Sequence, residues 1–331
     1  MAAFLAGQAL PLHSKGIIEG KTGIRRKCGR KKNPANEICM ISTRAKTIRL
    51  RQLLQEKRIH LMPCCGDGLS AKLIQRANFD FTFMSGFATA GSKGLPDTGL
   101  LGYKEMLENV AETSDVIDIP IIADADTGFG NAVNVRRTVM GFAKAGASGL
   151  LIEDQVNPKR CGHTKGKAVV DRDEALCRIR AACDARDEIA DGDGGPVIIA
   201  RTDAGRTSFE EALTRARLFH DLGADITFVE APQSEEQMRM YCQSVPGLKL
   251  ANMLEMGDTP ILPPKQLFEM GYSIAAYPLT LLSASVKAQE EVLAKLREGI
   301  PEEVQPLLKT FEELRDVVGF PEYYDAEEKY K

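Results

Sequence analysis

Short apolar runs alternate with amphipathic stretches along most of this chain, from about residue 47 onward. Continuous apolar runs of this length are typical of parallel strands, because helices cover both faces of a parallel sheet and bury every side chain. Eight such runs are present: Ile59–Pro63, Phe81–Ser85, Pro120–Ala123, Gly149–Ile152, Val197–Ala200, Ile226–Val229, Leu248–Ala251 and Ser273–Ala276.

The segments between these runs carry apolar residues at three- and four-residue spacing, which predicts amphipathic helices. Glu174–Ile189 and Phe209–Leu222 are the clearest examples. Gly223 and Gly271 stand where two of the helices should end, since glycine readily adopts the left-handed conformation that closes a helix. The chain is therefore expected to repeat a strand-then-helix unit.

Eight strand–helix units predict an α/β fold of the (β/α)8 TIM-barrel type, with a C-terminal helical extension, over residues 47–331. The alternative is an open, doubly wound sheet. Its usual phosphate-binding signature, GxGxxG at the start of the first helix, is missing, and Cys65–Gly66–Asp67–Gly68 only resembles it superficially. The pattern favours the closed barrel.

Polar residues stand at the ends of six of the eight apolar runs, the second to the seventh, and the eighth run ends near Tyr277. Barrel enzymes carry their catalytic groups at the C-terminal ends of the strands, which meet at one mouth. The polar ends are Ser85–Gly86, Asp124–Gly128, Glu153–Gln155, Arg201–Asp203, Glu230 and Asn252, and Cys64–Cys65 follows the first run. Their convergence predicts a functional site at this mouth.

Three carboxylates, Asp124, Asp126 and Glu153, follow adjacent strands and would repel one another without a counter-charge. A hard divalent cation with oxygen ligands removes that repulsion, and Mg²⁺ suits the site because it needs few carboxylates and keeps several waters. We therefore expect magnesium, with manganese as the alternative ion. The competing interpretation is a set of helix caps and ion pairs with Arg201.

The loop after the fourth run, Asn157–Lys167, is basic and contains glycine. It should lie over the barrel mouth and bring cations to an anionic substrate. Cys161 lies between Arg160 and His163, and neighbouring cations turn a thiol into a usable proton donor or nucleophile. Zinc is not expected here, because one cysteine and one histidine do not make a zinc site.

Composition limits the remaining possibilities. The 331 residues carry a net charge of −3, which gives no footprint for nucleic acid, and no apolar run is long enough to span a membrane. Residues 1–46 differ from the rest, with ten Lys or Arg and two acids, a net charge of +8. This predicts a cleavable transit peptide, for the chloroplast or alternatively the mitochondrion, with a plain basic arm as the competing interpretation.

Together these strings resemble the phosphoenolpyruvate mutase/isocitrate lyase superfamily, over about residues 47–331. The sequence KRCGH at 159–163 is similar to the lyase branch, whereas the mutase branch generally has an Asn-containing loop there. The chain lacks long insertions and so resembles the short members: 2-methylisocitrate lyase, dimethylmalate lyase, plant petal-death-type proteins, and chloroplast relatives labelled carboxyvinyl-carboxyphosphonate phosphorylmutase. The matching strings are Ser85–Gly86, 96–99 (PDTG), 124–128 (DADTG), 153–155 (EDQ), 159–163 (KRCGH), 200–203 (ARTD), 229–231 (VEA) and 251–253 (ANM).

The resemblance implies specific roles. Asp124 should contact the metal ion, while Asp126, Glu153 and Asp97 hold its waters. Cys161, assisted by Lys159, Arg160 and His163, should protonate the carbanion left by bond cleavage. The residues expected to bind the substrate are Ser85, Gly86, Phe87, Arg201, Glu230 and Asn252. The resemblance also implies a homo-oligomer, as a tetramer, in which the last barrel helix (Leu279–Arg297) is exchanged between subunits.

The expected activity is magnesium-dependent cleavage of a carbon–carbon bond in a small 2-hydroxy di- or tricarboxylate, giving an α-keto acid and a carboxylate. Two departures from the family stand out. Phe83 occupies the position where related lyases often carry a tyrosine, so the general base is unassigned. Pro278 falls where oxaloacetate hydrolases generally carry serine. The alternatives are a phosphonomutase, an oxaloacetate hydrolase and a non-catalytic carboxylate-binding barrel.

Overall fold

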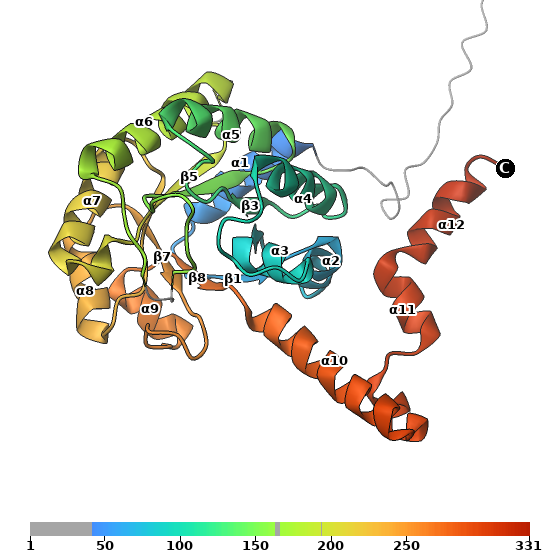
Figure 1. Cartoon of the computed structure of the whole chain (residues 1–331). Coiled ribbons are helices and arrows are strands. Elements are labelled where there is room, and N and C mark those ends of the chain that lie inside the picture. Colours follow the sequence, from blue (N-terminus) through green and yellow to red (C-terminus); the bar gives the residue numbers. More distant parts are fainter. Residues whose placement is uncertain (1–41, 163–165, 193) are drawn as a thin grey trace, which may run out of the picture. The chain divides into compact units, whose positions relative to one another are not determined.

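The computed structural model describes residues 42–162, 166–192 and 194–331, which belong to one compact unit. Within them, eight parallel strands pair in chain order and β8 closes on β1, so the predicted barrel is confirmed (Figure 1). The strands are β1 (His60–Cys65), β2 (Thr82–Met84), β3 (Ile121–Asp124), β4 (Gly149–Glu153), β5 (Val197–Thr202), β6 (Ile226–Val229), β7 (Leu248–Asn252) and β8 (Ile274–Tyr277).

Each strand lies on one of the eight apolar runs found in the sequence, displaced by at most two residues at either end. The side chains that point inward fill the lower half of the barrel; Phe81, Ile122 and Ile199 are fully buried there. Helix α1 (Thr43–Leu54) closes the lower end, with Leu50 and Leu53 fully buried. Apolar packing therefore occupies the bottom of the barrel and leaves polar groups to the opposite mouth.

Helices cover the outside of the barrel. They are α2 (Gly68–Arg76), α3 (Gly86–Ser92), α4 (Tyr103–Asp115), α5 (Ala132–Lys144), α6 (Arg172–Ile189), α7 (Phe209–Asp221), α8 (Glu235–Ser244) and α9 (Pro264–Met270). The predicted helices correspond to α6 and α7. Gly223 and Gly271 adopt φ values of +96° and +112° after their helices, as the sequence predicted.

Helix α1 begins at Thr43, so the folded chain starts slightly before residue 47. The proposed targeting segment 1–46 falls largely outside the described residues, which start at 42. In the part of the chain that the structure describes, no helix combines the length and hydropathy that crossing a bilayer requires.

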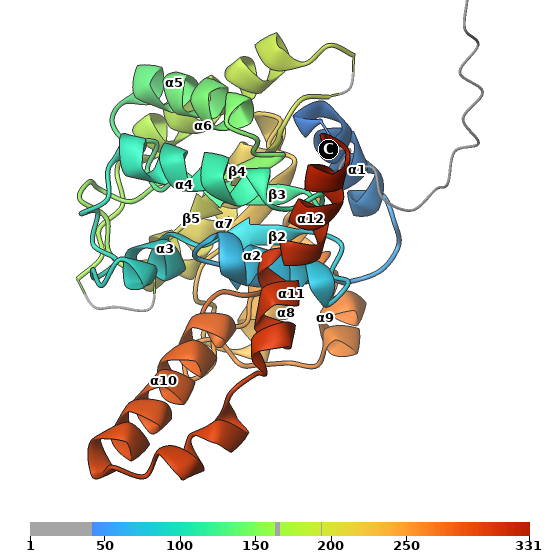
Figure 2. The same ribbon diagram turned by 90° about the vertical axis from the view of Figure 1, so that its right-hand side faces the viewer.

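The helix that follows β8, α10 (Thr280–Glu298), leaves the barrel after its first turn, and none of its residues is buried (Figure 1). The chain then returns through α11 (Phe311–Val318) and α12 (Phe320–Glu328). Helix α11 lies beside α2, where Arg76 pairs with Asp316 and the Lys72 ammonium donates to the carbonyl of Val318 (Figure 2). The eighth barrel helix thus forms as predicted, but it does not pack along its own barrel.

The outer face of β1 is left uncovered by this arrangement. Leu61 points outward and is 37% exposed, whereas the inward-pointing Met62 is fully buried. The two helices on either side of this gap also expose apolar residues: Leu69 and Leu73 on α2, and Phe268 on α9. We call these four side chains the apolar seat.

Candidate functional site at the barrel mouth

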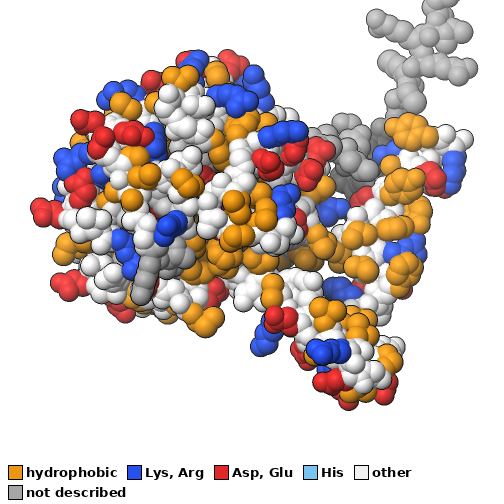
Figure 3. All heavy atoms as spheres, in the orientation of Figure 1, with side chains coloured by type: hydrophobic (Ala, Val, Ile, Leu, Met, Phe, Trp, Pro, Cys, Tyr) orange, Lys and Arg blue, Asp and Glu red, His pale blue; other side chains and the backbone are white. Residues whose placement is uncertain are grey.

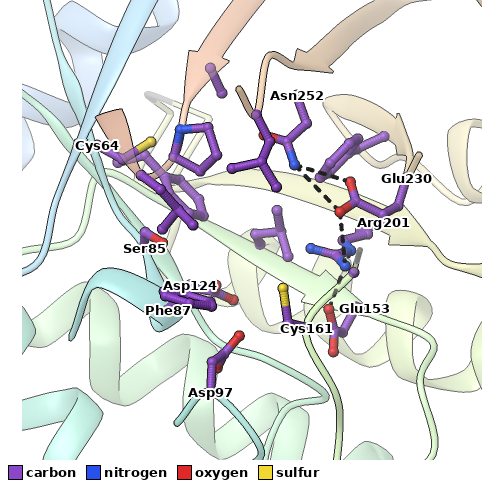
Figure 4. Close-up of a pocket in the computed structure, with 18 of the residues that line it drawn as sticks. Cys64, Ser85, Phe87, Asp97, Asp124, Glu153, Cys161, Arg201, Glu230 and Asn252 are labelled. Carbon is purple, nitrogen blue, oxygen red and sulfur yellow. Dashed lines mark hydrogen bonds and ion pairs between the residues drawn. The ribbon is translucent and has the colours of Figure 1, made fainter. Parts of the chain in front are cut away.

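A cavity with about 650 Å³ of unfilled space lies at the C-terminal ends of the strands (Figure 4). All eight described strands contribute side chains to its wall, together with the basic loop after β4. Its polar lining consists of Ser85, Asp97, Asp124, Glu153, Lys159, Arg160, Cys161, Arg201, Glu230 and Asn252. The convergence predicted from the strand ends is therefore confirmed by the geometry.

Asp124, at the end of β3, is oriented by two backbone amides. The amide of Gly86 donates to Oδ2 at 3.0 Å, and the amide of Asp126 donates to Oδ1 at 3.1 Å. Gly86 must be glycine for this approach, because a Cβ there would lie 2.8 Å from Oδ2. Asp126 has φ +48°, a strained conformation for a non-glycine residue that is typical of functional sites.

The neighbouring carboxylates are buried, and burial disfavours their charged forms. It raises the pKa of Asp126 to about 6, since repulsion from Asp124 adds to burial and attraction to Lys159 only partly offsets both. Burial also raises the pKa of Glu153 well above its usual range, against the attraction of Arg201. A cation bound beside Asp126 and Glu153 would favour their charged forms and so lower the free energy of the folded state.

The structure places Lys159 beside this cluster. Its ammonium lies 2.5 Å from Asp97 Oδ1 and 2.8 Å from Asp126 Oδ1, with all three side chains at least nine-tenths buried. Burial lowers the pKa of Lys159, but the surrounding carboxylates more than offset this, and the net shift is well upward. Lys159 is therefore a fixed positive charge among the proposed metal-binding carboxylates.

The cluster fits a largely hydrated magnesium ion. Among the described residues, no three His, Cys, Asp or Glu side chains converge closely enough to form a coordination shell by themselves. Mg²⁺ commonly takes one or two protein carboxylates and completes its octahedron with water. The buried Oε1 of Glu153 has no hydrogen-bond partner in the described residues, so it is available to accept from such a water.

Arg201, at the end of β5, is the centre of a second charged cluster. We call this cluster and the one around Lys159 the two poles of the pocket. Its Nε lies 2.8 Å from Asp203 Oδ2 and 3.3 Å from Glu153 Oε2, and Nη2 lies 3.5 Å from Glu230 Oε1. Asn252 donates to Glu230 from β7 (dashed lines in Figure 4). Burial alone would lower the pKa of Arg201, but these carboxylates raise it well above its usual range. None of these contacts uses Nη1, which remains able to bind an anion.

The basic loop reaches into the pocket. Gln155 holds it by accepting from the Arg160 amide and donating to the Arg160 carbonyl, both at 2.9 Å. Gly162 permits the approach, since a Cβ there would lie 2.0 Å from Glu230 Oε1 and 2.5 Å from Arg201 Nη2. Cys161 is half-buried on the pocket wall near Glu153 (Figure 4), while His163 lies outside the described residues.

Two of the residues expected to bind the substrate donate their backbone amides to groups of the protein. The amide of Ser85 donates to the carbonyl of Cys65, and that of Gly86 to Asp124. The Ser85 hydroxyl accepts from Ala88 and caps α3. Ser85 and Gly86 thus orient Asp124 and α3 in this structure, which differs from the expected direct grip on the substrate. Phe87 is among the residues that line the pocket.

Three features of the site were not assigned from the sequence. Asp203 binds both Arg201 and Lys167, and Gln155 clamps the loop. Both residues stood in the polar strand ends, but a single sequence gave no signal for their partners. The third feature is an apolar wall formed by Met62, Cys64, Phe83, Leu250, Leu254, Ala276, Pro278 and Leu279.

Comparison with known proteins gives a consistent set of relatives. The family model described as phosphoenolpyruvate phosphomutase matches residues 50–297. The chain is 39% identical to 2,3-dimethylmalate lyase of Eubacterium barkeri, covering 85% of this chain and 97% of that protein. It is 39% identical to the chloroplastic carboxyvinyl-carboxyphosphonate phosphorylmutase of Arabidopsis thaliana, with coverages of 91% and 89%. It is 40% identical to 2-methylisocitrate lyase of Aeropyrum pernix, with coverages of 83% and 87%.

Solved structures share the barrel. A crystal structure of 2,3-dimethylmalate lyase superposes with a TM-score of 0.80 at 37% identity, covering 88% of this chain and 96% of that one. Oxaloacetate acetylhydrolase, in complex with the inhibitor 3,3-difluorooxalacetate, superposes with a TM-score of 0.80 at 33% identity, with coverages of 87% and 97%.

The raised pKa of Asp126 predicts how stability depends on pH when no metal is bound. Between pH 3.8 and about 6 the folded protein holds a proton here that the unfolded chain has lost. In EDTA, the Asp126 contribution to the free energy of unfolding should therefore fall as pH rises through this window. Asp126→Asn cannot ionise and should gain stability relative to the wild type from pH 4 to 7, measured by urea denaturation. A difference that stays constant over this range would contradict the assignment.

Proposed function

The chain belongs to the phosphoenolpyruvate mutase/isocitrate lyase superfamily, whose similar members include carbon–carbon lyases, and we propose that it cleaves a small 2-hydroxy dicarboxylate into an α-keto acid and a second carboxylate. Its enzyme class is that of the lyases it resembles at about 40% identity over most of the chain. The observation that carries the proposal is that one pocket is lined both by a carboxylate cluster and by a cysteine-bearing basic loop.

Magnesium would be held by Asp124 directly and by Asp97, Asp126 and Glu153 through its waters. Bound there, it supplies positive charge that stabilises the developing alkoxide and keto acid. Arg201 binds the carboxylate of this half of the substrate through Nη1. The phenyl ring of Phe83 cannot accept a proton. The carboxylate cluster therefore accepts the 2-hydroxyl proton, because its Asp and Glu side chains are the bases nearest the metal-binding half of the substrate among the described residues.

Cys161 acts on the other half of the substrate. When the carbon–carbon bond breaks, its electron pair remains on the departing fragment as an enolate-like carbanion. Cys161 Sγ–H donates its proton to that carbon, and Arg160 stabilises the fragment's negative charge. The loop also limits access of water to the carbanion, because Gly162 lies directly against Glu230 and Arg201.

The apolar wall favours a dicarboxylate with hydrocarbon substituents over a tricarboxylate. Among the described residues, the cations lining the pocket are Lys159, Arg160 and Arg201, and the apolar wall contains none. Figure 4 shows Cys64, from this wall, on the side away from Asp97 and Glu153. A third carboxylate placed there would lose its hydration without gaining a cation, which is costly. We therefore propose a substrate of the 2,3-dimethylmalate type rather than the 2-methylisocitrate type.

A substrate panel tests this assignment. With magnesium, 2,3-dimethylmalate should release its keto acid with kcat/KM at least about tenfold above that of 2-methylisocitrate, as expected when a buried charge lacks a partner. EDTA should abolish the release, and added MgCl2 should restore it, with MnCl2 as the second ion. Phosphonopyruvate followed by phosphorus NMR and oxaloacetate followed by oxalate formation complete the panel. Turnover confined to either of these two would replace the lyase by a mutase or a hydrolase, and full activity in EDTA would exclude the metal.

Removing the Cys161 thiol should remove the proton donor. A positioned acid contributes about a hundred- to ten-thousand-fold in rate, so Cys161→Ala should lose kcat on that scale. Cys161→Ser should be similarly inactive, because a hydroxyl is a much weaker acid. Cys177→Ala is the matched control and should keep wild-type kcat, because this thiol is exposed on α6 and does not line the pocket. Wild-type kcat in Cys161→Ala, or a covalent adduct on the loop peptide in quenched wild-type enzyme, would contradict the role of proton donor.

We also propose that the protein is a homo-oligomer, as a tetramer, in which α10 of one copy packs on the apolar seat of another. Helix α10 exposes Val286, Leu293 and Leu296, at 46%, 64% and 51%, along a helix without a buried residue. Figure 3 shows hydrophobic side chains on the part of the barrel that faces the C-terminal helices. A second copy supplies an apolar surface for each of these unpaired faces.

Light scattering after size-exclusion chromatography should give the mass of a tetramer at micromolar concentration. Replacing Leu293 and Leu296 by Asp places two charges in the proposed contact and should shift the protein to smaller species. Val133→Asp, on an exposed position of α5, is the control and should leave the mass unchanged, since Val133 is 74% exposed and outside the apolar seat. A monomeric wild type would refute the exchange.

Finally, we propose that residues 1–46 direct the chain to the chloroplast, or alternatively to the mitochondrion. Their net charge of +8 supports this, and a plant relative described as chloroplastic matches 91% of the chain. Fused to a fluorescent reporter, the segment should send it to the organelle, while a reporter carrying residues 47–92 should remain diffuse. A diffuse signal from the 1–46 fusion would contradict the proposal.

A further inference from the structure

One buried carboxylate holds both the substrate-facing arginine and the end of the basic loop. Asp203 Oδ2 accepts from Arg201 Nε at 2.8 Å, and Oδ1 accepts from Arg201 Nη2 at 3.0 Å. The same Oδ1 accepts from the Lys167 ammonium at 2.6 Å. The Asp203 side chain is fully buried and that of Lys167 is 2% exposed. Two cations, one from β5 and one from the end of the basic loop, thus share one carboxylate.

Asp203 is itself held in place from the outer side of the barrel. Its amide donates to Asp154 Oδ1 at 2.9 Å. The other oxygen of Asp154 accepts from the Thr202 hydroxyl at 2.6 Å and from Arg215 at 3.0 Å. Burial raises the pKa of Asp203, but Arg201 and Lys167 more than offset this, and the net shift is downward. Asp203 is therefore a fixed anion with little freedom to move.

Lys167 stands at the base of the loop. An antiparallel bridge between Gln155 and Val169 joins the two ends of the loop, and the amide of Val156 donates to the carbonyl of Ala168 at 2.8 Å. Lys159 anchors the first half of the loop on Asp97 and Asp126. Lys167, at the end of the loop, is anchored on Asp203, which also binds Arg201. The segment carrying Cys161 is thus tied to both poles of the pocket.

We propose that Asp203 is a positioning residue that sets the orientation of Arg201 and, through Lys167, the seating of the Cys161 loop over the same substrate. By taking the Nε–Nη2 edge of Arg201, it leaves Nη1 to the substrate carboxylate. By holding Lys167, it keeps the proton donor within reach of the fragment that leaves. This rests on the proposed lyase function, because it assigns Arg201 and Cys161 to the two halves of one substrate.

The first experiment measures kinetics in four variants. Lys167→Met removes the loop anchor but leaves the Arg201–Asp203 pair, so kcat should fall about ten- to a hundredfold, the scale of one charge-assisted hydrogen bond, with KM changed less than about threefold. Lys167→Arg restores the cation and should recover most of kcat. Asp203→Asn disturbs both cations and should lower kcat and raise KM. Arg186→Met is the matched control, since it removes a largely buried cation from Asp225, just before β6 and away from the pocket, and it should lower thermal stability with kcat and KM near wild type.

The second experiment requires no turnover. Alkylation of Cys161 by iodoacetamide, followed by peptide mass spectrometry, reports how the loop is seated; the exposed Cys177 on α6 serves as internal reference. Oxalate with MgCl2 should slow Cys161 labelling in the wild type, in Lys167→Arg and in Arg186→Met. In Lys167→Met the labelling of Cys161 should be about tenfold faster than in the wild type, as expected for the loss of one charge-assisted hydrogen bond. Oxalate with MgCl2 should no longer slow it.

The outcomes separate the inference from the proposed function. If Lys167→Met matches Arg186→Met in both kcat and labelling, Asp203 is only a structural ion pair and the inference is wrong. If no substrate is turned over but Lys167→Met still exposes Cys161, the anchoring stands and the lyase assignment fails. Because Lys167→Met leaves Asp203 paired with Arg201, these results hold even if Asp203→Asn does not fold.

Discussion

Compensation of buried negative charge is the constraint on which the mouth of this barrel depends. Parallel strands that end in Asp or Glu bring carboxylates together at one edge, where burial and mutual repulsion oppose their ionisation. The raised pKa values of Asp126 and Glu153 show the extent of this opposition. Lys159 and Arg201 provide the nearest positive charges. The arrangement of the side chains at the mouth, and the chemistry proposed for them, follow from how the carboxylates share these two cations.

Two of the compensating cations come from the basic loop, and each binds a different pole of the pocket. Lys159 binds the cluster around Asp126, and Lys167 binds Asp203, which also binds Arg201. The loop is therefore part of the electrostatic balance of the site, and not only a cover over it. This explains how a segment outside the barrel strands can hold Cys161 in a defined place, since buried ion pairs break only at a large cost in free energy.

The barrel itself leaves one face incomplete. Seven strands are covered on the outside by helices of the same chain, as far as the described residues show, while Leu61 on β1 is exposed because α10 leaves the barrel. An exposed apolar face next to an unpaired amphipathic helix is typical of an interface with another chain. In the proposed oligomer, completion of the eighth strand–helix unit would therefore be coupled to assembly.

The sequence by itself determined the eight strands, the barrel and the place of the site, because burial on both faces makes each strand a continuous apolar run and strand ends converge in any such barrel. It also identified Asp124, Cys161 and Arg201 as candidate site residues, because a charged side chain at a strand end and a thiol in a basic loop each indicate a particular chemistry. Only the tertiary structure decided that Lys159 pairs with Asp97 and that Lys167 shares Asp203 with Arg201. These pairings join residues far apart in the chain and are selected by the cost of burying charge, which depends on distances in space that no local pattern records.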